Sequence, residues 1–245
     1  NQHIGIGIPW DLDRSIGGVT VLPPYEKSAN SQWYTGTANA IYQNLEYIDY
    51  YNPDYVLILS GDHIYKMDYE AMLDYHKTSK ADITLATYQV PMEEASRFGV
   101  VITDDTGCIQ EFEEKPEHPK SNYVVPGLYF YDNDVVSIAK SVRPSQRGEL
   151  EITSVNNEYL RRGKLKVKLF GRGLAWLDTG THENLLAAAN FVQIVQSRQG
   201  LYISCVEEIA YRMGYITADD LMKLAQPMLK TDYGQYLKRV AVGEI

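Results

Sequence analysis

The sequence predicts an α/β domain with a mixed, largely parallel sheet and a helical C-terminal tail. Helix and strand patterns alternate between residues 37 and 90, and the run Tyr55–Ser60 is apolar on both faces. From Thr181 onward the pattern is almost wholly helical. A strand without a polar face is typical of a sheet covered by helices on both sides, and the alternation favours parallel pairing in a doubly wound sheet.

The first elements follow from local spacing. Apolar residues recur at helical intervals from Thr37 to Tyr50, and Asn52-Pro53 ends that helix. After Tyr55–Ser60 we expect a polar turn, a helix over Tyr69–Ser79 and a strand over Ile83–Val90. The two strands are expected to pair in parallel.

The middle of the chain changes character. Residues 100–112 form a hairpin pattern around Gly107, and VVPGLYFY at 124–131 is expected to be one strand. Residues 135–142 have one apolar helical face, and Lys164–Phe170 alternates as a half-exposed strand. A hairpin among parallel strands makes the predicted sheet mixed.

The last part of the chain is predicted to be helical. One helix is expected over Thr181–Gln196, and the run TADD at Thr217 is typical of a capping box that begins a final helix. We therefore expect a core over residues 1–180 and a helical extension over 181–245 packed on it.

Composition excludes several classes of function. The chain has 23 Lys and Arg against 32 Asp and Glu, a net charge of -9, whereas nucleic acids and anionic membranes attract clustered positive charge. Cys108 and Cys205 lie far apart and match no disulfide scaffold or zinc pattern. The sequence contains no run of 18 apolar residues and begins without signal-peptide features. We expect a cytoplasmic protein with no nucleic-acid or membrane partner.

Two aspartates stand directly after predicted strands. Asp62 lies in LSGDH and Asp178 in LAWLDTG. Open α/β sheets bind ligands at the carboxyl ends of strands, and Mg²⁺ favours one or two carboxylates with phosphate oxygens and water. The pair therefore suits a shared cation in phosphoryl chemistry. The alternatives are a turn residue at Asp62 and a helix N-cap at Asp178.

Two further clusters suit an anionic sugar ligand. In EEKP, Lys115 offers a cation to a phosphate and Glu114 an acceptor to sugar hydroxyls, while Arg147 precedes a predicted helix in RGELEIT. The alternative for both is a solvated surface. Gly36 in GTANA precedes another helix, and Tyr34 beside it offers a ring that a base can stack on or that packs locally.

Longer runs resemble the sugar-1-phosphate nucleotidyltransferases. Within residues 2–118, WDLDR, GGVTVLPPY, WYTGTANAIYQN, LSGDHIYKMDY and EEASRFGV look like the glucose-1-phosphate adenylyltransferase (ADP-glucose pyrophosphorylase) branch. Within residues 123–245, GLYFYDNDVV, RGELEIT, GRGLAWLDTGTH, RQGL, EEIAYR and YGQYL look like the glucose-1-phosphate thymidylyltransferase branch. PKSN at 119–122 is the predicted seam, in either a natural divergent sequence or an engineered chimera.

The resemblance implies a Rossmann-like nucleotidyltransferase fold and a reaction. The phosphate of glucose 1-phosphate would attack the α-phosphorus of a nucleoside triphosphate (ATP or dTTP) and release pyrophosphate, which requires positioning and charge neutralisation rather than a protein nucleophile. The implied site comprises Mg²⁺ on Asp62 and Asp178; phosphate binding by Lys115 and Arg147; sugar binding by Glu114, Gly99 and Tyr129; nucleobase binding by Gly36 and Thr37 with Tyr34 nearby; and Trp176 packed beside the metal-bearing loop.

One family feature is missing from these residues. Family members open with a strand and a GGxGxRL loop that binds the triphosphate, and this sequence begins after that loop. We expect either an enzyme whose remainder lies outside these residues or a non-catalytic sugar-phosphate-binding subunit. An Mg²⁺-dependent glycosyltransferase is disfavoured because no DxD motif follows a strand. The adenylyl-like GTANA favours adenine or a relaxed base choice, and the helical tail implies a homo-oligomer.

Overall fold

The computed structural model describes residues 3–22, 37–103, 109–143, 150–171 and 174–245, which divide into two compact units. The sheet unit comprises Pro24–Ala188, and the helical unit joins Asn1–Pro23 to Ala189–Ile245. Helix α6 (His182–Gln199) begins in the sheet unit and ends in the helical unit.

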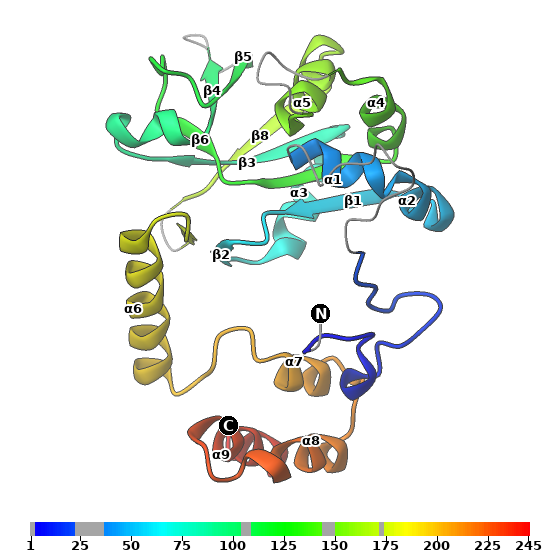
Figure 1. The fold of residues 1–245 in the computed structure, drawn as a ribbon, viewed down its shortest axis with the longest axis vertical. Helices are drawn as coiled ribbons and strands as arrows, with labels where there is room; N and C mark the ends of the chain where they lie inside the picture. Colours follow the sequence, from blue (N-terminus) through cyan, green and yellow to red (C-terminus); the bar gives the residue numbers. More distant parts are fainter. Residues whose placement is uncertain (1–2, 23–36, 104–108, 144–149, 172–173) are drawn as a thin grey trace, which may run out of the picture. The chain divides into compact units, whose positions relative to one another are not determined.

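A seven-stranded sheet forms the centre of the sheet unit (Figure 1). Its strand order is β1-β7-β3-β6-β4-β5, and β8 also pairs with β3. The strands are β1 (Tyr55–Leu59), β3 (Ile83–Gln89), β4 (Gly99–Thr103), β5 (Ile109–Glu114), β6 (Tyr123–Val125), β7 (Leu128–Asp132) and β8 (Leu165–Leu169). Among these strands, β3 and β8 pair in parallel and the other ladders are antiparallel.

The mixed sheet is therefore confirmed, but two expectations are wrong. The sheet is not largely parallel, since its ladders between described strands are antiparallel except that of β3 with β8, and β1 and β3 do not pair directly. Strand β7 lies between them and is antiparallel to both, so β1 and β3 run in the same direction without touching as neighbours. In β7, Leu128 to Tyr131 are all buried, as in a strand covered on both faces. Strand β1 is also apolar on both faces, but it ends the described strand order and its alternate residues Tyr55, Leu57 and Leu59 are exposed, so apolarity alone did not predict its position.

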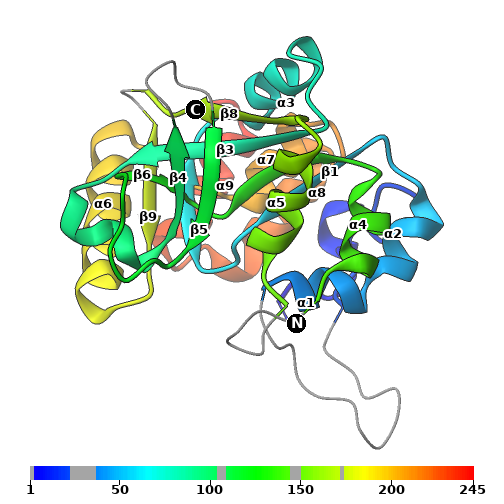
Figure 2. The same cartoon turned by 90° about the horizontal axis from the view of Figure 1, so that it is seen from above.

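Helices cover both faces of this sheet (Figure 2). Tyr129 and Tyr131 of β7 pack with residues of four helices: α1 (Thr37–Gln43), α2 (Leu45–Tyr51), α4 (Val135–Ser141) and α5 (Ile152–Arg161). Leu128 and Phe130 pack on the other face with Met72 of α3 (Tyr69–Thr78). Alternate side chains of one strand thus enter two separate cores, as the two-residue period of a strand requires.

Three predicted segments differ in their boundaries. The helix expected over 37–50 is divided at Asn44, whose side chain donates to the carbonyl of Ala40 (2.7 Å). The run VVPGLYFY is two strands, separated at Pro126-Gly127. Residues 63–66, expected within a turn, form β2 (His63–Lys66), which pairs antiparallel with β9 (Ala175–Asp178) in a separate two-stranded sheet.

The helical unit has its own apolar core. Trp10, in the short helix η1 (Ile8–Trp10), is 4% exposed and clusters with Leu221 and Leu237. The other elements are α7 (Val206–Arg212), α8 (Ala218–Ala225), η3 (Gln226–Met228) and α9 (Asp232–Ala241). The capping box predicted at Thr217 is present, because its side chain and that of Asp220 bond reciprocally to the backbone. None of the described helices has the length and apolarity needed to cross a membrane.

Candidate functional site

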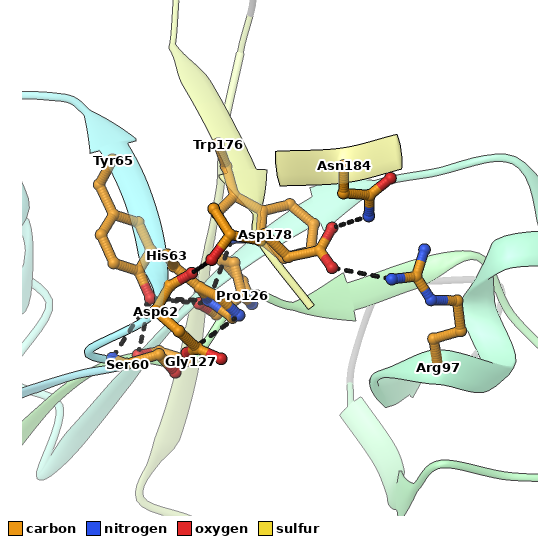
Figure 3. A network of polar contacts seen from close by, with 11 residues as sticks. Ser60, Asp62, His63, Tyr65, Arg97, Pro126, Gly127, Trp176, Asp178 and Asn184 are labelled. Carbon is orange, nitrogen blue, oxygen red and sulfur yellow. Dashed lines mark hydrogen bonds and ion pairs between the residues drawn. The ribbon is translucent and has the colours of Figure 1, made fainter. Parts of the chain in front are cut away.

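The structure brings Asp62 and Asp178 to adjoining strand ends (Figure 3). Asp62 directly precedes β2, and the β2–β9 register places His63 opposite Asp178. The next residue, Thr179, donates its hydroxyl to the carbonyl of Asp62 at 2.7 Å. Strand pairing therefore brings the backbones of two aspartates from distant parts of the sequence close together, while the carboxylate of Asp178 is turned towards Arg97 and Asn184.

The two carboxylates have different surroundings. Both oxygens of Asp178 are engaged, because Arg97 Nη2 lies 2.8 Å from Oδ2 and Asn184 Nδ2 lies 2.6 Å from Oδ1. The Asp178 side chain is 16% exposed, whereas that of Asp62 is 72% exposed, with His63 Nε2 at 3.8 Å. Helix α6 is capped by Thr181, which accepts the backbone N–H of Asn184. This contact supplies a helix cap other than Asp178.

The residues that follow Asp62 are held by a cluster of polar contacts around His63 and Tyr65. His63 Nδ1 lies 3.0 Å from the carbonyl of Pro126, 3.1 Å from the Tyr65 hydroxyl and 3.3 Å from Trp176 Nε1. Tyr65 donates to the Pro126 carbonyl at 2.6 Å, and burial raises the pKa of Tyr65 to about 12. The hydroxyl is therefore a stable donor at neutral pH, and it ties β2 to the connection between β6 and β7.

A three-residue segment, Arg97 to Gly99, links Asp178 to the EEKP cluster. Arg97, at the end of η2 (Met92–Arg97), contacts Asp178. The Phe98 carbonyl accepts the backbone N–H of Lys115 at 3.1 Å, and Gly99 pairs with Glu114 in the β4–β5 register. Lys115 and Glu114 are thus paired with the backbone of the same segment whose Arg97 side chain contacts Asp178.

Glu114 and Lys115 differ in how firmly they are held. Thr153, near the start of α5, donates its hydroxyl to the Glu114 carboxylate. Lys115 is exposed, has a backbone φ of 45°, and forms no ion pair with another described residue. Neighbouring Glu113 is paired with Lys120 (3.1 Å). The surface pairing expected of a solvated cluster therefore involves Glu113, while Lys115 is left accessible to a ligand.

The predicted site also includes two aromatic residues, Tyr129 and Trp176, which pack against other rings. Tyr129 is 7% exposed and stacks on Tyr131 (5.9 Å between ring centroids). Burial raises the pKa of Tyr129 well above its usual range, and the charge of Glu114 adds to that rise. The Trp176 ring contacts Phe98 (5.0 Å) and His63 (5.6 Å), which places it beside the residue that follows Asp62.

Part of the predicted site cannot be compared with the structure. Tyr34, Gly36 and Arg147 lie outside the described residues. Thr37 begins α1, but its side chain is not described. Arg97, which lies in the run EEASRFGV, and Asn184 were not among the site residues predicted from the sequence. Neither contact with Asp178 was foreseeable, because both depend on tertiary packing.

The donors of Asp62 and Asp178 fit a divalent cation such as Mg²⁺. Their ligating atoms are carboxylate oxygens, which Mg²⁺ prefers, and Mg²⁺ usually takes only one or two carboxylates from a protein. Within the described part of the chain, no group of three or more His, Cys, Asp or Glu residues is arranged to hold a metal. A site here would therefore complete its coordination with water and ligand oxygens.

Comparisons with known proteins agree on one family. The family described as nucleotidyl transferase matches residues 1–194. A glucose-1-phosphate adenylyltransferase from Lachnospira eligens is 59% identical over 181 residues, covering 74% of this chain and 43% of that protein. One from Clostridium botulinum (strain Eklund 17B / Type B) is 59% identical over 197 residues, covering 77% of this chain and 49% of that protein.

A solved structure also matches, described as a glucose-1-phosphate thymidylyltransferase from Bacillus anthracis in complex with a sucrose. It has 35% sequence identity, a TM-score of 0.57, and coverage of 66% of this chain and 62% of that chain. Both branches of the resemblance are thus represented among these relatives. The chain spans about half the length of the curated relatives it matches.

Proposed function

The chain belongs to the nucleotidyl transferase family, and from that premise we propose that it acts in nucleotide-sugar synthesis. The reaction is attack by the phosphate of glucose 1-phosphate on the α-phosphorus of a nucleoside triphosphate, with pyrophosphate as the leaving group. The observation that supports the proposal is the β2–β9 register, which pairs His63 with Asp178 and so places Asp62 next to the end of β9. The adenylyltransferase relatives support glucose 1-phosphate as the sugar substrate and ATP as the nucleotide, with dTTP as the alternative.

Each proposed role follows from charge and position. Asp62 and Asp178 would hold Mg²⁺, which supplies charge neutralisation for the phosphates. Lys115 and Arg147 bind the sugar phosphate, and Glu114 accepts from sugar hydroxyls. The remaining contacts of the proposal are Gly99 and Tyr129 around the sugar, Gly36, Thr37 and Tyr34 at the nucleobase, and Trp176 behind the Asp62 turn.

The proposal extends to the whole protein. We place it in the cytoplasm as a homo-oligomer, with the catalytic site in the sheet unit (Pro24–Ala188) and residues 189–245 in the helical unit. Light scattering that finds only a monomer would argue against the oligomer.

The test uses full-length protein that contains these residues, with glucose 1-phosphate, Mg²⁺ and either ATP or dTTP. We expect pyrophosphate release with ATP, and a fall in kcat of about 10²–10³ in Asp62→Asn and Asp178→Asn, which is the scale of losing charge stabilisation at a reacting group. Strict dTTP preference would refute the choice of adenine. Binding of glucose 1-phosphate without pyrophosphate release would favour a non-catalytic subunit.

A further inference from the structure

We propose that Arg97 is a positioning residue that holds the Asp178 carboxylate while no divalent cation is bound, and that it gives way to the cation when one binds. The inference rests on the proposed function, because it requires a cation at Asp62 and Asp178. It assigns a role to a residue that the proposed reaction does not otherwise use.

The Arg97–Asp178 ion pair compensates the charge of a largely buried carboxylate. The Asp178 side chain is only 16% exposed, and a largely buried carboxylate is costly unless a positive charge or several donors compensate it. Arg97 Nη2, 2.8 Å from Oδ2, supplies that charge, while Asn184 on Oδ1 is a neutral donor. Asp178 therefore carries a compensating positive charge before any cation arrives.

The geometry of the Arg97–Asp178 ion pair is suited to replacement of Arg97 by a cation. The recorded contact joins a single guanidinium nitrogen, Nη2, to a single oxygen, Oδ2, rather than forming the two-bond fork that makes arginine–carboxylate pairs strong. The Arg97 side chain is 36% exposed, so it can return to water when released. Asn184 would keep Oδ1 oriented after Arg97 leaves.

The other carboxylate, that of Asp62, is open to solvent. Asp62 is 72% exposed, so it can receive a hydrated cation without displacing a protein group at short distance. The cation then competes with Arg97 for Oδ2 of Asp178. Arg97 consequently lowers the affinity of the resting site for the cation, whereas a residue that only braces Asp178 would raise it.

The experiment measures Mn²⁺ binding to the full-length protein, without nucleotide or sugar, by water-proton relaxation. We expect Arg97→Gln to bind Mn²⁺ about fivefold more tightly, or about 1 kcal/mol, the value of one partly exposed ion pair. Arg97→Lys keeps the charge and should bind as the unmodified protein does. Arg162→Gln is the matched control, because Arg162 lies in the same unit, is 39% exposed, and is also paired with a carboxylate.

The results distinguish a failure of the role proposed for Arg97 from a failure of the proposed cation site. Equal or weaker Mn²⁺ binding in Arg97→Gln overturns the inference and leaves the proposed reaction standing. If the unmodified protein binds Mn²⁺ no better than Asp178→Asn, the cation site fails and the inference fails with it. Should Arg97→Gln not fold, the Nε–H resonance of Arg97 in the unmodified protein decides: it must shift on titration with Mg²⁺, and an unchanged resonance at saturation overturns the inference.

Discussion

At the residue scale, Gly127 shows how closely the Asp62 turn is packed. Its backbone φ is 67°, a conformation that residues other than glycine adopt only at a cost in energy. A Cβ added to Gly127 would lie 2.1 Å from Ser60 Oγ. The Gly127 carbonyl also accepts the backbone N–H of Ser60 at 3.0 Å. This glycine therefore lets the β6–β7 connection approach the chain two residues before Asp62.

Gly127→Ala should lower the free energy of unfolding by about 2–4 kcal/mol, which combines the positive φ with the steric overlap. Gly163→Ala is the matched control, because Gly163 has nearly the same φ (68°) but nothing within 4 Å of its added Cβ. It should cost about 1–2 kcal/mol. Urea unfolding measures both, and a Ser60→Ala background should reduce the excess cost at Gly127. Equal costs for the two glycines would contradict close packing at this turn.

At the element scale, α3 is joined to the sheet by a buried polar contact. His76 is 1% exposed, and its Nδ1 lies 2.8 Å from the Thr84 hydroxyl of β3. Burial lowers the pKa of His76, an effect that the charge of Asp82 partly offsets. The neutral imidazole therefore belongs to the folded state, and protonation opposes the packing of α3.

The stability of the sheet unit should consequently depend on pH. Above the unfolded pKa of about 6.5, His76 is neutral in both states and contributes its full stability. As the pH falls below that value, His76 becomes protonated in the unfolded chain but stays neutral in the folded unit, where its pKa is lowered. The free energy of unfolding therefore falls by at most about 1.4 kcal/mol per pH unit, until the pH passes the lowered pKa of the folded unit. In His76→Phe this component should be absent. Urea unfolding at pH 7.5 and 5.5 tests it, and an identical pH dependence in both proteins would refute it.

At the scale of the whole molecule, the helical unit is built from both ends of the described chain. Trp10, from the first residues, lies in one apolar cluster with Ile216, Leu221 and Leu237. The contact between η1 and α7 belongs to the same unit. The N-terminal segment is therefore part of the core that stabilises the C-terminal helices.

Trp10→Ala should destabilise this unit by about 3–5 kcal/mol, the usual cost of removing a large buried aromatic side chain. Hydrogen exchange of the α8 and α9 amides should become faster. Trp10→Phe should cost less, because it keeps most of the apolar volume and removes an indole N–H that has no partner among the described residues. Unchanged exchange in Trp10→Ala would show that the helices are stable without the N-terminal segment.

The sequence by itself determined the elements whose signals are local. The strand Tyr55–Ser60, the helix after Asp68 and the capping box at Thr217 were all visible, because apolar spacing and caps act over a few residues. The candidates Asp62 and Asp178 could be named for the same reason, since each follows a strand signal. Family resemblance then predicted the class of chemistry.

Only the tertiary structure decided which elements are neighbours. The insertion of β7 between β1 and β3, the pairing of β2 with β9, and the ion pair of Arg97 with Asp178 join residues far apart in the chain. No local spacing encodes such contacts, because strand pairing and charge compensation depend on which surfaces the whole core brings together. The residue with the most specific new role, Arg97, could therefore be recognised only after folding placed it against Asp178.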